Sequence, residues 1–499
     1  MRRTIASTAL VLGGLLLAGC ATAPGSTGDI PVATDAIIDI RVGLEPTSLD
    51  VTTTSGAGLV QVMRGNVYEG LVGLSEDLEI LPALASDWEI SDDGLVYTFT
   101  IRDGVVFHDG TPMTIDDVVA SLQASSAEGS MNPAAKRMAS VATVEATDEN
   151  TLVVTLAERD INFLESLTTS AGYIVAAESS IDLAAATNGT GPYTLDQWNR
   201  GATLSLELFD DYWGEAPLND GVVFHYIADE TTAATALQGG EVDILAGVTA
   251  ETADLLRGAD EFQVVEGDST SWMTMGFNHN FAPLQDQRVR QALRQAIDKE
   301  ELIQVIGGQA IEVGTITVPT DTWHVDATDS APYDPEASRE LLAEAGYETL
   351  DLTLTVSNTY DTIITEFIAA ELAEVGVNVT IDTVEFATWL EDVYTNKDFE
   401  LTMVLHVDPA TITYYGNPGY YWSYNNAEAQ SLVTAARQAE SAEIRDEKLR
   451  EVAELVAADS ASDWLYSPQT VVVAGKNVSG FPVDRISNNF RVSGITVAE

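Results

Sequence analysis

The stretch that decides the fold runs from Leu81 to Ser121 and reads LPALASDWEISDDGLVYTFTIRDGVVFHDGTPMTIDDVVAS. Within it, Leu95 to Ile101 alternates large apolar residues with smaller or polar ones, which predicts a half-buried strand. An Asp-Gly turn leads to a second short strand, Val105 to Phe107. A further Asp-Gly turn leads to a helix that begins with a Thr114 cap and an acid, Asp117, three residues later. The stretch therefore predicts a hairpin followed by a helix, a unit common to many folds.

The whole string also follows a recognisable order of residues. Its segments fit P-x-L-A-x-x-W, D-G-x-x-Y-x-F, R-x-G-V-x-F-H-D-G-x-P and T-x-x-D-V. The positions that agree are Pro82, Leu84, Ala85, Trp88, Asp93, Gly94, Tyr97, Phe99, Arg102, Gly104, Val105, Phe107, His108, Asp109, Gly110, Pro112, Thr114, Asp117 and Val118. This agreement resembles the signature of the extracellular solute-binding proteins of the peptide/nickel type, family 5, the receptors of ABC importers.

Segments downstream resemble the same family. They are G-T-G-P-Y at Gly189–Tyr193, D-Y-W-G at Asp211–Gly214, G-E-V-D at Gly240–Asp243, and the segment from Phe277 to Asp298. The resemblance covers nearly the whole mature chain. It implies an α/β fold of the two-lobed, periplasmic-binding-protein-like kind (class II, cluster C type) with an extra inserted domain.

The resemblance also implies how the chain is divided. Lobe I would take residues 36–68, 189–268 and 466–499, the inserted domain 69–188, and lobe II 269–465. Two crossovers near Phe277 and Tyr466 would act as a hinge, and ligand would bind between the lobes and close them.

Periodicity supports an α/β lobe independently of the resemblance. Leu350 to Val356 and Val377 to Ile381 alternate as strands, with a helical segment from about Ile364 to Val375 between them. Such a unit indicates a partly parallel sheet. Elsewhere, Thr143 to Val154 predicts a hairpin.

Other helices follow from spacing and from glycine stops. Apolar residues recur at helical spacing from Val289 to Ile306, and Gly307–Gly308 can end that helix. A last helix from Ala427 to about Ala458 has a possible break near Ala442.

Composition limits the class of protein. A chain of 499 residues should divide into two or three domains. Its 78 acidic and 23 basic residues give a formal net charge of −55, which argues against nucleic-acid binding. The acidic surface suits salty or extracellular conditions, and steering of a cationic solute is the alternative interpretation.

The N-terminus predicts export and lipid anchoring. A short basic region and an apolar run too short to span a bilayer end in Leu-Ala-Gly-Cys20, which resembles a bacterial lipobox. Residues 1–20 would form the signal peptide, Cys20 would carry the lipid, and 21–35 would be a flexible tether. Cys20 is the only cysteine, so no disulfide can form within the chain. We expect the protein to lie on the extracytoplasmic face of the cell membrane.

No catalytic constellation is evident in the sequence. The five histidines are isolated, with no H-x-x-x-H or C-x-x-C spacing and no G-x-S-x-G elbow. With 78 carboxylates, pairs capable of acid–base work arise by chance and carry no weight. We therefore expect no enzyme activity, no resident metal and no cofactor. A secreted hydrolase on the same scaffold and an adhesion or structural lipoprotein remain the competing classes.

The resemblance carries residue-level expectations for the ligand site. In peptide-binding relatives an Asp holds the ligand ammonium, and Asp408 occupies the matching position here, with His406 near the place of the family's Trp. A turn-forming role for Asp408 before a proline is the alternative. Dipeptide-binding relatives clamp the ligand carboxylate with an Arg after the strand that ends near Val356. This chain has Asn358 and Tyr360 there and no base.

Two further segments complete the expected site. The hydroxyl-rich loop around Ser55 and Gly56 corresponds to a cleft loop in family members. An aromatic loop after Asp408 includes Tyr421 and Trp422, whose rings suit peptide side chains or sugar faces.

The sequence thus predicts a monomeric substrate-binding lipoprotein that captures a small solute or oligopeptide and delivers it to the transmembrane permease subunits of an ABC importer. An oligosaccharide or a nickel chelate is the alternative ligand.

Overall fold

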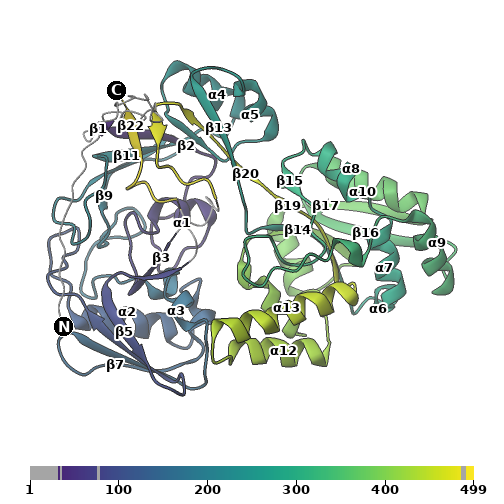
Figure 1. The fold of residues 1–499 in the computed structure, drawn as a ribbon, viewed down its shortest axis with the longest axis horizontal. Coiled ribbons are helices and arrows are strands. Elements are labelled where there is room, and N and C mark those ends of the chain that lie inside the picture. The colour runs from purple at the N-terminus through teal and green to yellow at the C-terminus, as the bar shows by residue number, and fades with distance from the viewer. Residues whose placement is uncertain (1–31, 34–35, 76–78, 485–489, 499) are drawn as a thin grey trace, which may run out of the picture.

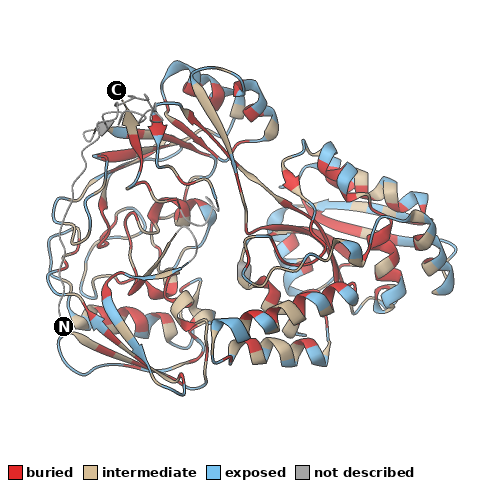
Figure 2. Ribbon diagram, in the orientation of Figure 1, coloured by how far each residue is buried: buried red, intermediate tan, exposed pale blue. Residues whose placement is uncertain are grey.

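Three β-sheets with their covering helices organise the chain (Figure 1). The computed structural model describes residues 32–33, 36–75, 79–484 and 490–498. We call the seven-stranded sheet with its helices lobe I, the six-stranded sheet with its helices lobe II, and the four-stranded sheet with its helices the inserted domain. Each has a hydrophobic core, and buried residues follow the strands and form patches on the helices (Figure 2). The expected two-lobed α/β fold is confirmed, whereas the exact domain boundaries stay a prediction.

Lobe I is a mixed sheet with β2 (Ile37–Val42) at its centre. β2 runs parallel to both of its neighbours, and the outer strands are antiparallel. In sheet order the strands are β13 (Phe262–Gly267), β20 (Thr470–Gly475), β12 (Ile244–Ala246), β2, β11 (Gly221–Tyr226), β10 (Thr203–Leu208) and β9 (Tyr193–Asn199). Its helices are α1 (Ala57–Met63), α4 (Glu230–Gly239) and α5 (Ala250–Leu256). A small sheet of β1 (Val32–Ala33), β22 (Thr496–Ala498) and β21 (Val478–Ser479) joins the two ends of the described chain.

The inserted domain contains the stretch that opened the sequence analysis. Its sheet order is β5 (Ala85–Ile90), β6 (Val96–Ile101), β8 (Thr151–Leu156) and β7 (Val141–Ala146), and β7 and β8 form the expected hairpin. The expected pairing of β6 with a strand at Val105–Phe107 is wrong. Both edges of β6 are already taken by β5 and β8, and the chain leaves β6 through a turn with Gly104 at φ 77°. Val106 instead forms an isolated bridge with Pro112.

The expected helix start is confirmed. Helix α2 (Ile115–Ser126) begins after Thr114, whose main-chain N–H and hydroxyl both donate to the Asp117 carboxylate, at 2.8 and 2.7 Å. This capping box satisfies a donor that the first helical turn would otherwise leave unpaired. The remaining elements are the hairpin of β3 (Val72–Leu74) and β4 (Ile80–Pro82), helix α3 (Phe163–Ser166) and the short 3₁₀ helices η1 (Ala135–Met138) and η2 (Ser170–Gly172).

Lobe II contains the predicted strand–helix–strand unit. β16 (Leu350–Ser357), α10 (Thr362–Glu374) and β17 (Val377–Val384) follow one another, and the two strands pair in parallel from Leu350–Val377 onward. In sheet order the strands are β15 (Ala310–Ile311), β19 (Ser462–Pro468), β14 (Trp272–Phe277), β18 (Leu401–His406), β16 and β17. The other helices are α6 (Ala282–Gln285), α7 (Gln287–Gln295), α8 (Lys299–Val305), α9 (Pro335–Glu344), α11 (Phe386–Trp389), α12 (Ala427–Arg437) and α13 (Ala442–Ala458). The break near Ala442 is confirmed.

The helix expected from Val289 to Ile306 forms as two helices, α7 and α8. The chain turns between them because Asp298 leaves the helical conformation and its carboxylate accepts the Glu301 N–H at 2.9 Å. The break brings Arg294 and Lys299 to the same buried Asp463 on β19, at 3.4 and 2.7 Å. Buried charges need such partners, because an unpaired charge in a core is strongly destabilising.

The chain passes between the lobes in two places. One crossover joins β13 of lobe I to β14 of lobe II, and the other joins β19 of lobe II to β20 of lobe I through Gln469 alone. Phe277 and Tyr466, at which the sequence predicts the hinge, lie inside β14 and β19. Two short crossovers permit rotation of one lobe against the other and little translation.

The G-T-G-P-Y segment requires its glycines for close packing. A Cβ at Gly189 would lie 1.9 Å from the Val67 carbonyl oxygen, and one at Gly191 would lie 2.6 Å from the Asn66 carbonyl oxygen. Backbone oxygens cannot move as side chains can, so no larger residue fits. This contact packs the return from the inserted domain against lobe I.

We expect Gly189→Ala to lower the free energy of unfolding by about 2–3 kcal/mol, because the methyl group would displace the backbone around Val67. Gly239→Ala is the matched control, since a Cβ there meets nothing within 4 Å and Gly239 is the last residue of α4. That control should be neutral or stabilise by up to about 1 kcal/mol. Thermal and urea denaturation of both variants checks the difference, and equal midpoints would contradict the packing role.

Candidate ligand-binding site

A cavity of about 740 Å³ lies where lobe I, lobe II and the inserted domain meet. Lobe I supplies Val51, Ser55, Gly56, Met63 and the segment 481–484 to its wall. The inserted domain supplies Pro133, Arg137, Ile161 and Glu165, and lobe II supplies Thr320–Trp323, Val407, Asp408 and Arg445. The volume falls within the range of small-ligand sites, and the walls combine apolar surface with a few charged groups, as such sites do.

Three of the residues expected at the site line this cavity. Ser55 and Gly56 lie just before α1, and Asp408 follows β18. They come from segments more than three hundred residues apart, and only the tertiary structure brings them to one space. Their ligand contacts stay a prediction.

Asp408 is paired across the cavity with a residue that the sequence analysis missed. The Arg137 guanidinium donates to Asp408 Oδ1 at 2.6 Å, and the Ala410 N–H donates to the same oxygen at 3.0 Å. Burial would lower the pKa of Arg137, but Asp408 and Glu165 outweigh it and raise that pKa. The Lys136–Arg137 pair, unusual in so acidic a chain, is the sequence signal that could have pointed here.

The other five expected residues lie outside the cavity wall. Asn358 is exposed after β16, and the Tyr360 hydroxyl accepts the Leu405 N–H at 3.0 Å. Tyr421 and Trp422 are 1% and 0% exposed. In this conformation the two rings therefore expose no surface that a ligand could contact.

His406 is buried against those rings. Its Nε2 lies 3.1 Å from the Tyr421 hydroxyl, and its ring centroid lies 5.5 Å from that of Trp422. Burial lowers the pKa of His406 to about 4, with Asp408 opposing that shift. The imidazole is therefore neutral at pH 7 and belongs to the packing beneath Asp408.

A second arginine in the wall comes from lobe I. Arg64 donates to the Thr168 hydroxyl at 2.9 Å, and burial lowers its pKa. Arg64 and Thr168 thus link lobe I to the inserted domain beside the cavity. Cationic side chains are gathered here even though the chain as a whole is acidic.

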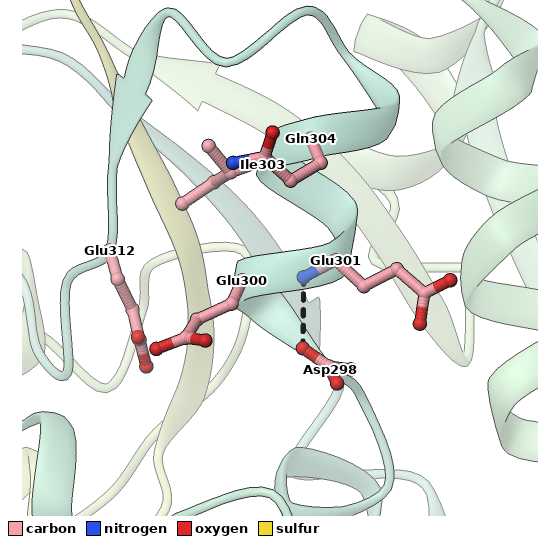
Figure 3. Close-up of a pocket in the computed structure, with 6 residues that line it drawn as sticks. All are labelled: Asp298, Glu300, Glu301, Ile303, Gln304 and Glu312. Carbon is pink, nitrogen blue, oxygen red and sulfur yellow. Dashed lines mark hydrogen bonds between the residues drawn. The ribbon is translucent and has the colours of Figure 1, made fainter.

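A separate groove on lobe II is lined by acidic residues (Figure 3). Asp298, Glu300 and Glu312 surround it, while the Glu301 carboxylate points away. The Asp298 carboxylate already caps α8, and burial is the main cause that raises the pKa of Glu312. Among the described residues, no group of three or more His, Cys, Asp or Glu side chains could hold a metal ion.

Comparison with known proteins agrees with this geometry. Residues 79–438 match the family described as bacterial extracellular solute-binding proteins, family 5 Middle. The glutathione-binding protein GsiB of Salmonella typhimurium is 29% identical over 354 residues, which are 69% of each chain. The same protein of Escherichia coli is 28% identical over 77% of this chain and 75% of the relative.

Solved structures share the fold. The periplasmic binding protein DppA of Helicobacter pylori, in complex with the peptide STSA, superposes with a TM-score of 0.80 at 23% identity, covering 93% of this chain and 98% of that one. The oligopeptide-binding protein AppA of Bacillus subtilis, in complex with a nonapeptide, has a TM-score of 0.79 at 21% identity, covering 94% and 100%.

Two lobes joined by two crossovers around a cavity define a solute receptor of the periplasmic-binding-protein class. The chain belongs to the bacterial extracellular solute-binding proteins of family 5. It is a substrate-binding protein of an ABC importer and not an enzyme, and it acts outside the cytoplasm. None of the helices in the described part of the chain is both long and apolar enough to cross a membrane.

The neutral, buried His406 predicts acid sensitivity. Because the pKa of His406 in the folded protein, about 4, lies below the ordinary histidine pKa of 6.5, its contribution to stability is complete above pH 6.5 and is lost as pH falls toward 4. Between pH 6.5 and 4, this histidine should add roughly 1.4 kcal/mol per pH unit to the slope of the free energy of unfolding against pH. His406→Gln should remove that part of the slope. Urea denaturation of the wild type and of His406→Gln at intervals from pH 8 to 4 measures this. The free energies of unfolding of the wild type and of His406→Gln should change in parallel between pH 7 and 8 and diverge below pH 6.5. Curves that stay parallel down to pH 4 would refute the low pKa assigned to His406.

Proposed function

We propose that this protein captures an oligopeptide in the 740 Å³ cavity, with the peptide ammonium held by Asp408, and delivers it to the permease of an ABC importer. The observation that carries the proposal is that Asp408 lines the cavity and already holds a cationic partner there. An ammonium offers the same charge and hydrogen-bond donors as the guanidinium it would join or replace.

The free edge of the Asp408 carboxylate supports this role. Both of its hydrogen bonds, from Arg137 and from the Ala410 N–H, go to Oδ1. Among the described residues no hydrogen bond reaches Oδ2, and the side chain is 38% exposed. A ligand ammonium can therefore approach Oδ2 without first breaking the ion pair.

The other end of the ligand is less constrained. Asn358 carries no charge and lies outside the wall, so a free carboxylate is not clamped where dipeptide-binding relatives clamp it. This favours a peptide longer than two residues. The curated relatives named as glutathione-binding proteins make the tripeptide glutathione the second candidate, since it also carries an ammonium.

The remaining expectations complete the proposal. The mature protein would be a monomer, anchored to the outer face of the membrane by lipid on Cys20, with the lobe boundaries predicted above. Cys20 lies outside the described residues. An oligosaccharide or a nickel chelate stays the alternative ligand.

A binding panel tests the ligand class. Calorimetry with di- to penta-alanine, glutathione, maltotriose and nickel–histidine should give binding only with ammonium-bearing peptides, and N-acetylation should weaken it. Binding of maltotriose or nickel–histidine and of no peptide would support one of the alternative ligands instead.

Asp408→Asn should weaken binding of the tightest peptide by about 1.5–3 kcal/mol, the contribution of a hydrogen bond to a charged group. Arg137→Gln is the matched control, because it breaks the same ion pair but keeps the carboxylate. That variant should bind the peptide as well as the wild type or better. Unchanged affinity in Asp408→Asn rules out the ammonium role, and equal losses in both variants assign the effect to the ion pair.

Cys20→Ser should release the protein from the membrane fraction into the medium or periplasm, because the thiol is the proposed site of lipid attachment. Fractionation, with mass spectrometry of the mature N-terminus, checks this. A Cys20→Ser protein that stays in the membrane fraction would be inconsistent with a lipid anchor at this position.

A further inference from the structure

The inserted domain meets lobe II at a junction beside the cavity, where helix α12 ends. The Ile161 N–H donates to the Arg437 carbonyl at 2.9 Å, and Arg159 Nη1 donates to the Ala439 carbonyl at 3.3 Å. The Arg437 guanidinium also pairs with the Glu158 carboxylate. Figure 1 shows α12 against the inserted domain, below the crossovers that join the lobes. A short loop of one body thus makes three interactions with the end of a helix in the other.

The end of a helix is chemically suited to this contact. The last four carbonyls of a helix have no partner within it, and the Arg437 carbonyl is one of them. They also carry a partial negative charge that favours cations. Arg159 is held toward them because its Nε and Nη2 donate to the Asp93 and Asp92 carbonyls of its own domain, at 3.0 and 2.9 Å. The inserted domain therefore presents donors in fixed positions to acceptors that α12 leaves open.

The charges at the junction are complementary, but water screens them. Besides Glu158, Arg437 is close to Asp160, whose pKa is raised by burial and lowered in part by Arg437. The Arg437 and Glu158 side chains keep 41% and 45% of their surface exposed. An ion pair this exposed contributes little by itself. Such a contact can break and form again as the lobes move.

The inserted domain moves with lobe I. The chain enters it from lobe I and returns to β9 of lobe I through the G-T-G-P-Y segment. His108 Nε2 lies 3.0 Å from the Gly191 carbonyl oxygen and fastens the domain to that return. The chain enters lobe II only later, from β13 of lobe I. Rotation of the lobes about the two crossovers would therefore separate the inserted domain from α12.

We infer that residues 158–161 of the inserted domain and 437–439 of lobe II form a latch that sets ligand affinity without touching the ligand. Glu158, Arg159, Arg437 and Ala439 are absent from the cavity wall, so their contacts stabilise the closed arrangement whatever it holds. Apparent affinity falls in proportion to the share of the protein in the binding-competent arrangement. A weakened latch should therefore raise the Kd of every ligand by the same factor, whereas loss of Asp408 should affect only ammonium-bearing ligands. The inference rests on the function of the family as solute receptors and not on the class of ligand.

Calorimetry with tetra-alanine and glutathione tests the latch. Glu158→Gln and Arg437→Gln should each raise the Kd roughly 2- to 5-fold, the effect of losing one exposed ion pair. The double variant should lose no more than either single variant, because both remove the same pair. Glu158→Lys places two cations together and should raise the Kd roughly 10-fold. The factor should be the same for both ligands, and the dissociation rate should rise in proportion.

Arg257→Gln is the matched control. It breaks an ion pair with Glu266 whose side chains are 48% and 44% exposed, as at the latch, but which lies within lobe I. That variant should leave the Kd unchanged. Wild-type affinity in Glu158→Lys would refute the latch, and so would a loss of the same size in Arg257→Gln.

A chemical cross-link tests the same contact directly. Cys20 is the only cysteine, so in a Cys20→Ser chain the changes Glu158→Cys and Arg437→Cys introduce the only two thiols. A short bis-maleimide added after saturation with tetra-alanine should join them and hold the lobes closed. The peptide should then survive dialysis that removes it from the same protein without the cross-link. Equal release from both would show that the junction does not govern opening.

Failure of the latch and failure of the proposed function are distinguishable. If tetra-alanine binds and no latch variant changes its Kd or its release, the latch is refuted and the proposed function stands. If no peptide binds while maltotriose or nickel–histidine does, the proposed function fails. The latch then stands or falls on the same variants and the same cross-link with that ligand in place of tetra-alanine.

Discussion

The ion pair between Arg137 and Asp408 is the interaction on which the shape of the binding cavity depends. It joins the inserted domain to lobe II at 2.6 Å, across a sequence separation of 271 residues. Neighbouring contacts strengthen the same junction, since the Ile161 N–H donates to the Arg437 carbonyl at 2.9 Å and Arg437 pairs with Glu158. Lobe I is already joined to lobe II by the two crossovers. The cavity lies where these three bodies meet, and residues of all three line it.

The ion pair between Arg137 and Asp408 is weak enough for a ligand ammonium to share or replace it. The Arg137 and Asp408 side chains keep 26% and 38% of their surface exposed, so water screens their attraction. Exposed ion pairs of this kind contribute little to stability. The pair can therefore orient the carboxylate in the empty protein and still share or release it when a ligand ammonium arrives. A fully buried pair, such as Lys299 with Asp463, would be too costly to break and serves the fold instead.

Where sequence reasoning succeeded, the cause of structure was local. The capping box at Thr114, the strand and helix periods of β16, α10 and β17, and the break between α12 and α13 all depend on residues within a few positions of one another. It failed where a distant partner decided the outcome. Val105–Phe107 has the composition of a strand, but β5 and β8 already occupy both edges of β6. The helix expected from Val289 to Ile306 divides because Asp298 caps a new helix and Asp463, far along the chain, takes both neighbouring cations.

By itself, the sequence determined the family, several of the helices and strands, and the candidacy of Asp408, because motif order and periodicity are properties of neighbouring residues. Only the tertiary structure decided which side chains share a space. It placed Ser55, Gly56 and Asp408 at one cavity, enclosed Tyr421 and Trp422 in a core, and brought Arg137, which the sequence analysis missed, to the cavity wall. An aromatic residue in a Gly- and Pro-rich loop can face a ligand or a core. The choice depends on what packs against it from hundreds of residues away, which no local pattern records.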